Sequence, residues 1–212
     1  SSDVCSSDLE NYRNLTAEHC GSGSLRNLVF HYCGLELSEA VVFGLGAGLD
    51  CMYIPVPGME PPFMLFGRGE FFEVDFAAAL DLDYVEQEEP DDRQAWIQVA
   101  EQVVAGKPTM LCGDIFYLDY RNYTVNFPGH RFVLLGYDEE RQETYIADRI
   151  NEETEVCSME GLRQCRNAPV GVSSNNRWGR FDSGRVGNSL EDACGIAIKN
   201  AAETMLGIGG TR

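Results

Sequence analysis

The chain has 212 residues, 44% of them hydrophobic, which is enough for one full core and part of a second domain. This composition excludes a disulfide-stapled miniprotein and a disordered tail. Acidic residues outnumber basic ones 34 to 16, and the formal charge of -18 would repel phosphate backbones and anionic membrane surfaces, so we expect neither nucleic acid nor membrane as a partner. Because the chain has no bilayer-length apolar run and no signal-peptide pattern, the sequence predicts a soluble, cytoplasmic protein.

The first nine residues look foreign to the rest of the chain. Residues 4–9 match the translation of a common sequencing-adapter end, so we leave residues 1–9 out of the fold reasoning. Eight cysteines are scattered along the sequence without a C-x-x-C pair, and without the one in this segment their number is odd. Complete disulfide pairing is therefore impossible, and we expect reduced thiols.

Spacing and capping residues predict the elements of the amino-terminal half. Apolar positions after Cys20 repeat with helical spacing and stop at Gly34, which places Cys20 at or near a helix amino terminus. The other elements predicted in this half are a short helix capped by Ser38 and running through Phe43, a strand at 49–54, a proline-rich surface loop at 55–62, a helix capped by Asp75 and running through Leu80, and a helix opened by Asp91 or Asp92 that stops before Gly106.

The strongest strand signals lie in the second half. A buried strand is predicted at 108–112, and an apolar run at 131–137, a polar turn and a strand at 144–148 predict a hairpin that His130 enters and Asp148 leaves.

Further on, residues 173–188 are polar and glycine-rich and are predicted to be a linker, after which Ser189 and Asp192 resemble a capping box that opens a final helix. Because helices and strands come in blocks, the sequence favours an α+β fold over a doubly wound sheet.

Only three histidines are present, so few histidine-dependent sites are possible. A hairpin would fix His130, and Asp148 on the paired strand could hold one imidazole nitrogen while the other acts as a base. The dipole of a helix and a nearby imidazolium would both favour the thiolate of Cys20. On spacing alone, a core cysteine and a structural histidine explain these residues as well, and both interpretations stay open.

Other site types fit the sequence less well. The glycines of 44–48 follow a helix and not a strand, so close backbone packing explains them better than a dinucleotide site. His19 and Cys20 are adjacent and no second pair has ligand spacing, so neither a metal nor another cofactor is expected.

A series of short motifs covers most of residues 17–165, and their order and spacing make the combination specific. The motifs are His19-Cys-Gly-Ser-Gly-Ser-Leu-Arg-Asn-Leu28, Leu37-Ser-Glu39, Phe43-Gly-Leu-Gly-Ala-Gly-Leu49, Gly67-Arg68, Asp114-Ile-Phe-Tyr-Leu-Asp-Tyr120, Pro128-Gly-His-Arg-Phe-Val-Leu-Leu-Gly-Tyr-Asp138 and Tyr145-Ile-Ala-Asp148. Together they resemble the amino-terminal domain of the butirosin biosynthesis protein H family, which belongs to the papain-like superfamily alongside the cysteine peptidases that trim double-glycine leader peptides. The resemblance implies a papain-like α+β fold, with amino-terminal helices packed on an antiparallel sheet.

Carried over by position, the resemblance implies that Cys20 is the nucleophile, His130 the base and Asp148 the residue that orients the base. Four further residues inside these motifs are expected to bind substrate, although solvated or capping carboxylates are commoner: Glu39, Arg68, Asp114 and Tyr117.

The oxyanion hole departs from the family pattern. Papain-like enzymes use a glutamine a few residues upstream of the nucleophile, and that position here holds Asn14, which is shorter and is better explained as a loop or cap residue.

The resemblance implies a function in antibiotic biosynthesis, because the family's named member transfers an aminoacyl group from an acyl carrier protein thioester to an aminoglycoside amine. The expected partners are an acyl carrier protein or pantetheine thioester as donor and a cationic amine as acceptor. An acidic protein suits such an acceptor but repels an acidic carrier, unless Arg13, Arg26 or Arg68 forms a local basic patch. A papain-like peptidase or amide hydrolase, and a binding module in which Cys20 is idle, remain as alternatives.

The expected domain organisation follows from the same resemblance. Residues 10–172 would form the catalytic domain, residues 173–188 the linker, and residues 189–212 the start of a truncated helical carboxy-terminal domain.

Overall fold

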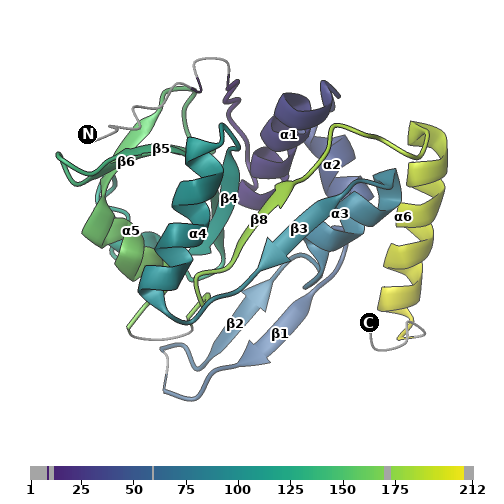
Figure 1. Cartoon of the computed structure of the whole chain (residues 1–212). Helices are drawn as coiled ribbons and strands as arrows, with labels where there is room; N and C mark the ends of the chain where they lie inside the picture. Colours follow the sequence, from purple (N-terminus) through teal and green to yellow (C-terminus); the bar gives the residue numbers. More distant parts are fainter. Residues whose placement is uncertain (1–8, 10–11, 59, 170–172, 208–212) are drawn as a thin grey trace. The chain divides into compact units, whose positions relative to one another are not determined.

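The computed structural model describes residues 9, 12–58, 60–169 and 173–207 (Figure 1). The segment expected to be foreign, apart from Leu9, lies outside the described residues. The chain folds into two compact units, the first made of residues 1–31 and 85–180 and the second of residues 32–84 and 181–212.

A six-stranded sheet with the order β3-β8-β4-β5-β6-β7 is the frame of the first unit, although Tyr84 of β3 and Phe181 of β8 belong to the second unit. The pairs β8–β4, β4–β5, β5–β6 and β6–β7 are all antiparallel. The predicted hairpin is confirmed as β5–β6, and every residue of β5 is buried. The strands are β3 (Tyr84–Gln87), β4 (Thr109–Gly113), β5 (His130–Asp138), β6 (Glu143–Ala147), β7 (Glu155–Ser158) and β8 (Trp178–Phe181).

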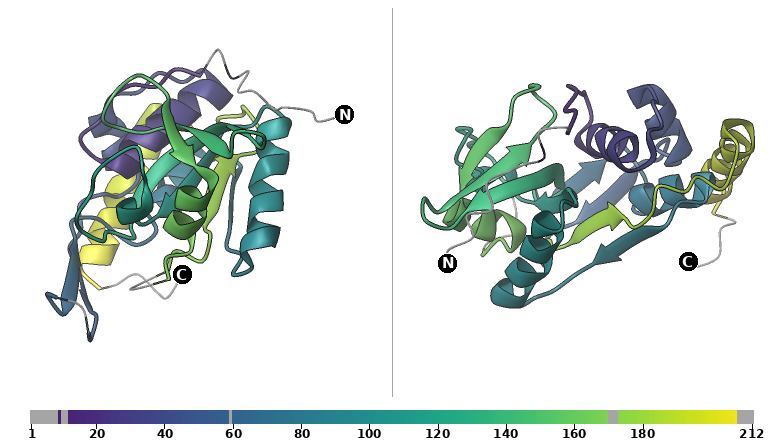
Figure 2. Two further views of the ribbon diagram at one scale, coloured as in Figure 1. Left: turned by 90° about the vertical axis from the view of Figure 1, so that its left-hand side faces the viewer. Right: turned by 45° about the horizontal axis from the view of Figure 1, so that its top comes forward.

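Helices of the first unit are α1 (Cys20–Cys33, whose last two residues belong to the second unit), α4 (Asp92–Val104) and α5 (Met159–Arg166), with a 3-10 turn, η1 (Ile115–Tyr117). Figure 2 shows α4 in teal and α5 in green beside the strands of the sheet. Both helices contribute buried side chains to one core cluster with the sheet, among them Val99, Val103, Leu162, Phe132 and Leu134. Of the two predicted starts of α4, Asp91 and Asp92, Asp91 is the cap, because its side chain accepts a hydrogen bond from the backbone N–H of Gln94.

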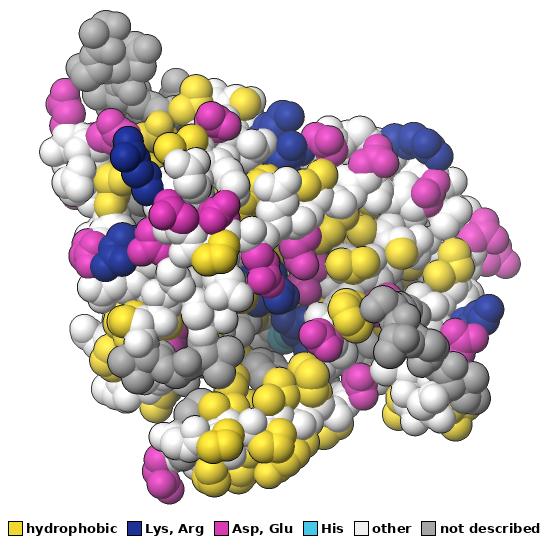
Figure 3. All heavy atoms as spheres, turned by 60° about the horizontal axis from the view of Figure 1, so that its bottom comes forward, with side chains coloured by type: hydrophobic (Ala, Val, Ile, Leu, Met, Phe, Trp, Pro, Cys, Tyr) yellow, Lys and Arg dark blue, Asp and Glu magenta, His cyan; other side chains and the backbone are white. Residues whose placement is uncertain are grey.

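The second unit contains α2 (Glu39–Leu45), α3 (Phe72–Leu80), α6 (Leu190–Met205) and the hairpin of β1 (Met52–Pro55) and β2 (Phe63–Phe66). Ser38 caps α2 and Ser189 caps α6, as predicted. Tyr53 and Leu65 of the hairpin are exposed, and hydrophobic side chains gather over it at the lower edge of Figure 3.

Two predictions on the elements are wrong. The segment 173–188 is not a linker throughout, because it contains β8, whose side chains are buried and which pairs with β4. Its polar, glycine-rich composition hides two large apolar residues, Trp178 and Phe181. Helix α3 begins at Phe72 rather than after a cap at Asp75, because burial of the Phe72 and Phe76 rings fixes the helix more firmly than a cap does.

The sequence analysis also missed strands β2, β3 and β7 and helix α5. Each of the three strands has only four residues, too few to show a clear alternation. None of the helices in the described part of the chain has both the length and the apolar character needed to cross a bilayer.

Candidate active site

The ends of three elements in the first unit bring Cys20, His130 and Asp148 together. Cys20 is the first residue of α1, His130 the first residue of β5, and Asp148 follows directly after β6. His130 Nε2 donates to Asp148 Oδ1 at 3.0 Å, and the imidazole also hydrogen-bonds the Cys20 thiol. Since Nε2 is engaged by the carboxylate, Nδ1 is the ring nitrogen left for the thiol. The imidazole therefore links the thiol to the carboxylate.

The start of α1 is fixed by the residue before the cysteine. His19 Nδ1 accepts a hydrogen bond from the backbone N–H of Ser22 at 3.1 Å, and the His19 carbonyl accepts one from the N–H of Gly23 at 3.0 Å. His19 is thus the cap of the helix, a role that its place beside Cys20 did not reveal. The first turn has no acidic residue, so no carboxylate of the helix itself opposes its dipole at the thiol.

A glycine lets this helix pack closely on the chain that precedes it. A Cβ at Gly23 would lie 2.5 Å from the Cβ of Ala17, closer than two carbon atoms can approach. Ala17 in turn donates its backbone N–H to the carbonyl of Arg149 at 2.9 Å. Close packing at Gly23 therefore holds the start of α1 against the residue that follows Asp148.

Asn14 links α1 to the loop after β6 through hydrogen bonds. Its amide nitrogen donates to the carbonyls of Asp148 at 3.0 Å and Asn151 at 2.8 Å, and its amide oxygen accepts from Asn27 at 2.9 Å. Both amide hydrogens are thus committed to backbone carbonyls, which agrees with a loop role and does not favour one in the oxyanion hole. The amide positions the loop after β6 and, with it, the carboxylate of Asp148.

Sequence reasoning missed one residue of this group, Tyr120. Its hydroxyl donates to Asp148 Oδ2 at 3.0 Å, while the backbone N–H of Arg149 donates to Oδ1 at 2.7 Å. Burial and the charge of Asp148 raise the pKa of Tyr120, so the phenol stays a hydrogen-bond donor. The only signal for Tyr120 in the sequence was its place in a family-like motif. The motif does not reveal which residue the side chain contacts, so the bond to Asp148 could not be predicted.

Electrostatics within the group favour an ion pair. Burial acts to raise the pKa of Cys20, but the hydrogen bond and charge of His130, assisted by the backbone N–H and charge of Arg131, lower it to about 7. Burial acts to lower the pKa of His130, but Asp148 and Cys20 raise it to about 9. The pKa of Asp148 is lowered, because the bonds from His130, Arg149 and Tyr120 outweigh its burial. Between pH 7 and 9, the thiolate and imidazolium forms therefore predominate.

The other thiols of the described residues are also free, but two of them lie in very different surroundings. Burial, together with the carboxylate of Asp119, raises the pKa of Cys157 to about 12, and burial raises that of Cys165 as well. Across the described ranges, no three side chains of ligand type gather into a metal site.

Two of the expected substrate-binding residues lie in the first unit. Asp114 is buried, and its carboxylate accepts hydrogen bonds from the backbone N–H groups of Phe116 and Phe127 and from the Asn126 amide, so it organises its own loop. The half-buried side chain of Tyr117 packs against the core cluster and the ring of Phe116. Substrate binding by these residues stays a prediction, and the bonds of Asp114 do not support it.

The other two expected substrate-binding residues belong to the second unit. Glu39 is half-buried in the first turn of α2. Arg68 forms an ion pair with Glu73 at 3.4 Å, and its guanidinium lies over the ring of Phe72. Their roles in substrate binding also stay predictions.

Comparisons with known proteins bear on this arrangement. The family model described as butirosin biosynthesis protein H, N-terminal, matches residues 19–149, more than half of the chain and the part that carries Cys20, His130 and Asp148. No curated protein matches the chain. A solved structure described as a C39-like peptidase from Bacillus anthracis matches with a TM-score of 0.58 at 15% sequence identity, over 88% of this chain and 100% of that chain. The fold is therefore the papain-like α+β fold that the sequence predicts.

Proposed function

The chain belongs to the butirosin biosynthesis protein H, N-terminal, family, and on that premise we propose that it is an acyltransferase, which moves an acyl or aminoacyl group from a carrier thioester to an amine. Both the family and the fold support a papain-like cysteine enzyme. The observation that carries the proposal is the thiol of Cys20, hydrogen-bonded to an imidazole that Asp148 holds.

The first half-reaction loads the enzyme. The Cys20 thiolate attacks the thioester carbonyl, and a tetrahedral intermediate forms. As this intermediate collapses, the bond from the carbonyl carbon to the donor sulfur breaks, and the leaving thiolate takes the proton of the His130 imidazolium. The products are a free carrier thiol, an acyl group on Cys20 and a neutral imidazole, which is ready to act as a base.

The second half-reaction transfers the group. Neutral His130 removes a proton from the amine as its nitrogen attacks the acyl-enzyme carbonyl, and collapse expels the Cys20 thiolate. An amide leaves, and the thiolate–imidazolium pair is restored. A thioester is already activated, so the residues that the chemistry requires are a thiolate, a base and a group that holds the base in place.

Charge supports the acceptor more than the donor. A chain with a formal charge of -18 attracts polycationic amines and repels acidic carrier proteins. In the first unit, the guanidinium of Arg26 donates to the neutral carbonyls of Leu15 and Thr16, and that of Arg13 lies over the ring of Phe30. These two arginines are the best placed to offer a carrier a local basic patch beside α1.

A peptidase is the second candidate, and the C39-like structural neighbour favours it. It would use the same three residues, with water in place of the amine in the second step and the His130 proton going to an amine leaving group. The family match supports the transferase over this alternative.

The test is a direct competition between the two reactions. An acyl-pantetheine thioester is offered with a panel of aminoglycosides and polyamines, and double-glycine peptides are offered separately, with products identified by mass spectrometry. We expect amides to form faster than free acid, and both to be lost in Cys20→Ala but kept in Cys194→Ala, which removes an exposed thiol instead. Peptide cleavage without amide formation would establish the peptidase, and activity retained in Cys20→Ala would exclude both enzymes.

A further inference from the structure

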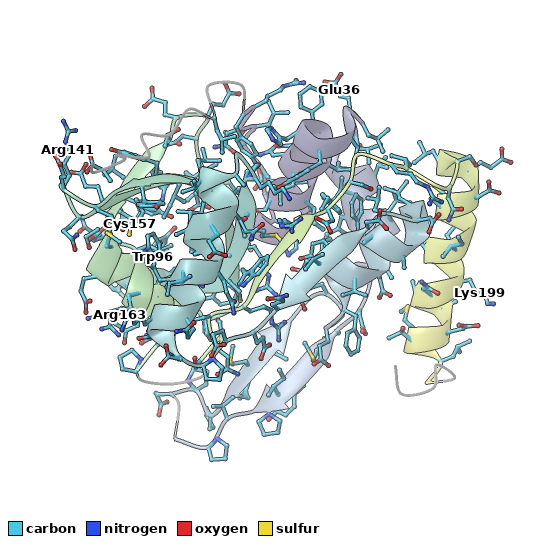
Figure 4. The ribbon with its side chains drawn as sticks, in the orientation of Figure 1. Glu36, Trp96, Arg141, Cys157, Arg163 and Lys199 are labelled. Atoms are coloured by element: carbon cyan, nitrogen blue, oxygen red, sulfur yellow. The ribbon has the colours of Figure 1, made fainter. Side chains whose placement is uncertain are left out.

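A cavity of about 360 Å³ opens between α4 and α5 in the first unit. This volume lies within the range of small-molecule sites. Neither Cys20, His130 nor Asp148 lines it, so it is separate from the catalytic group. Figure 4 labels Trp96 and Arg163, which reach the cavity from α4 and α5.

One wall of the cavity contains a buried guanidinium that forms no ion pair with a described residue. Arg166, the last residue of α5, is 2% exposed. Its Nη2 donates to the carbonyls of Ala95 and Asn176, both at 3.3 Å, whereas no described residue accepts a bond from its buried Nε or forms an ion pair with it. Burial lowers its pKa to about 10 against the opposing charges of Cys165 and Asp92, so it stays charged at neutral pH. A buried cation without an ion-pair partner is unusual, and a bound anion would explain it.

The carboxylates around the cavity form their ion pairs with another arginine. Arg163 is already paired with Asp92 and with Glu160, each at 2.7 Å. Arg93 lies exposed at the rim, and no residue in the described part of the chain pairs with it. Three arginines against two carboxylates give the lining a net charge of +1, in a chain whose formal charge is -18. A ligand with one negative charge would therefore neutralise the net charge of the lining.

The rest of the wall is apolar. Trp96 is half-buried and holds a fixed edge-on contact with Tyr137, their ring centres 5.1 Å apart. Met159 and Leu162 of α5 also line the cavity. Such surfaces bind an aromatic ring or a branched aliphatic group.

We propose that this cavity binds a small organic carboxylate with an aromatic or branched aliphatic body. The carboxylate pairs with Arg166 and Arg93, and the body packs against Trp96, Met159 and Leu162. A guanidinium suits a carboxylate because its N–H groups match the two oxygens in spacing and plane. A single negative charge also balances the lining, which a doubly charged phosphate ester does not. The site is independent of the chemistry at Cys20.

Calorimetric titration of the full chain with 3-phenylpropionate and with isovalerate tests the proposal. We expect one carboxylate bound per chain, and binding at least about tenfold weaker for 3-phenylpropanamide and 3-phenylpropylamine, which keep the ring but lack the negative charge. No binding of either acid, or equal binding of the amine, would overturn the proposal. Tighter binding of phenyl phosphate would overturn the choice of a carboxylate.

Variants separate this cavity from other sites. Arg166→Met should weaken binding of 3-phenylpropionate at least about tenfold without lowering the unfolding temperature of the free protein, since it removes an unpaired buried charge. Arg93→Gln should weaken binding about threefold, whereas Lys199→Gln, an equal loss of charge on α6, should leave it unchanged.

Two further variants keep the test decisive if Arg166→Met does not fold. Met159→Trp fills the cavity but keeps every arginine, and it should weaken binding as strongly as Arg166→Met would. Cys20→Ser should bind the acid as the native chain does. Unchanged binding in Met159→Trp, or lost binding in Cys20→Ser, would overturn the proposed site, and neither outcome bears on the acyltransferase.

Discussion

Two buried thiols of the first unit, Cys20 and Cys157, have pKa values that are shifted in opposite directions. Cys20 is 9% exposed and Cys157 is fully buried, so burial acts to raise the pKa of both. His130 and the backbone N–H of Arg131 nevertheless lower the pKa of Cys20 to about 7, whereas the Asp119 carboxylate beside Cys157 helps to raise its pKa to about 12. Burial suppresses a thiolate, and only a positive or hydrogen-bond-donating partner restores it.

Two buried cations of the first unit, His130 and Arg166, show that the partner of a buried group also decides the direction of a cation's pKa shift. Asp148 and Cys20 raise the pKa of His130, while Arg166 forms no ion pair with a described residue and burial lowers its pKa against the opposing charges of Cys165 and Asp92. The group of Cys20, His130 and Asp148 thus contains both members of its ion pair, whereas Arg166 in the cavity between α4 and α5 forms no ion pair with a described residue. This contrast is why we assign chemistry to the first and a ligand to the second.

Removing each thiol in turn should have the largest effect. Cys20→Ala should abolish acyl-enzyme formation from an acyl-pantetheine thioester, because it removes the thiol whose pKa the His130 imidazole lowers. Intact-mass spectrometry measures this directly. Cys157→Ala should lower stability by about 1–2 kcal/mol through the cavity that it leaves, but should still form the acyl-enzyme. If Cys157→Ala stopped acylation while Cys20→Ala did not, the contrast between the two thiols would be reversed.

Removal of the imidazole should make Cys20 resemble Cys157. In His130→Ala the pKa of Cys20 should rise to 9 or above, because burial then acts without its main opponent. The thiolate fraction at pH 7 would fall from about one half to about one hundredth, and alkylation should slow about tenfold after allowing for the greater nucleophilicity of a more basic thiolate. Iodoacetamide labelling followed by peptide mass spectrometry gives the rate, and an unchanged rate would mean that the imidazole does not activate the thiol.

The next largest effect is expected from Gly23, whose close contact with Ala17 positions the helix that carries Cys20. Gly23→Ala brings two Cβ atoms to 2.5 Å, and we expect a loss of about 1–3 kcal/mol in the free energy of unfolding. Denaturant titration gives this value. The double variant Ala17→Gly with Gly23→Ala removes the clash and should regain more than half of the loss relative to Ala17→Gly alone. Equal losses with and without the Ala17 Cβ would show that this contact is not the constraint.

Tyr120→Phe should have the smallest effect. It removes one hydrogen bond to Asp148, which is worth about 0.5–1.5 kcal/mol. The pKa of Asp148 should rise and the support for the imidazolium should weaken, so the pKa of His130 should fall below about 9. A shift of the alkaline limb of the pH–rate profile to lower pH, with substrate affinity unchanged, would identify a positioning role. A change in stability alone would leave Tyr120 as a structural residue.

Local signals in the sequence were sufficient for the parts of the fold that local physics determines. The β5–β6 hairpin and the caps at Ser38, Asp91 and Ser189 follow from residues a few positions apart. Strand β8 was missed because its two apolar residues stand in a polar, glycine-rich segment and its pairing with β4 is long-range.

The same distinction holds for the candidate site, where local patterns place some residues and tertiary packing places the others. Placement of Cys20 at a helix start follows from spacing, and the hairpin brings His130 and Asp148 close. The contact of Tyr120 with Asp148 joins residues that no sequence periodicity relates. In the sequence, Arg166 looks like any basic residue in the last turn of a helix, so its burial could not be predicted. Such contacts depend on tertiary packing, which single-sequence patterns do not encode.

Titration of the Cys20 thiolate tests the central claim most directly. Its lowered pKa means that the thiolate stabilises the fold at high pH and that this contribution is lost as the pH falls through about 7; the raised pKa of His130 means that the imidazolium contributes at low pH and is lost as the pH rises through about 9. The ultraviolet thiolate absorbance of the native chain, minus that of Cys20→Ser, should therefore rise with a midpoint near pH 7 and shift to 9 or above in His130→Ala. A midpoint at or above 9 in the native chain would contradict the account.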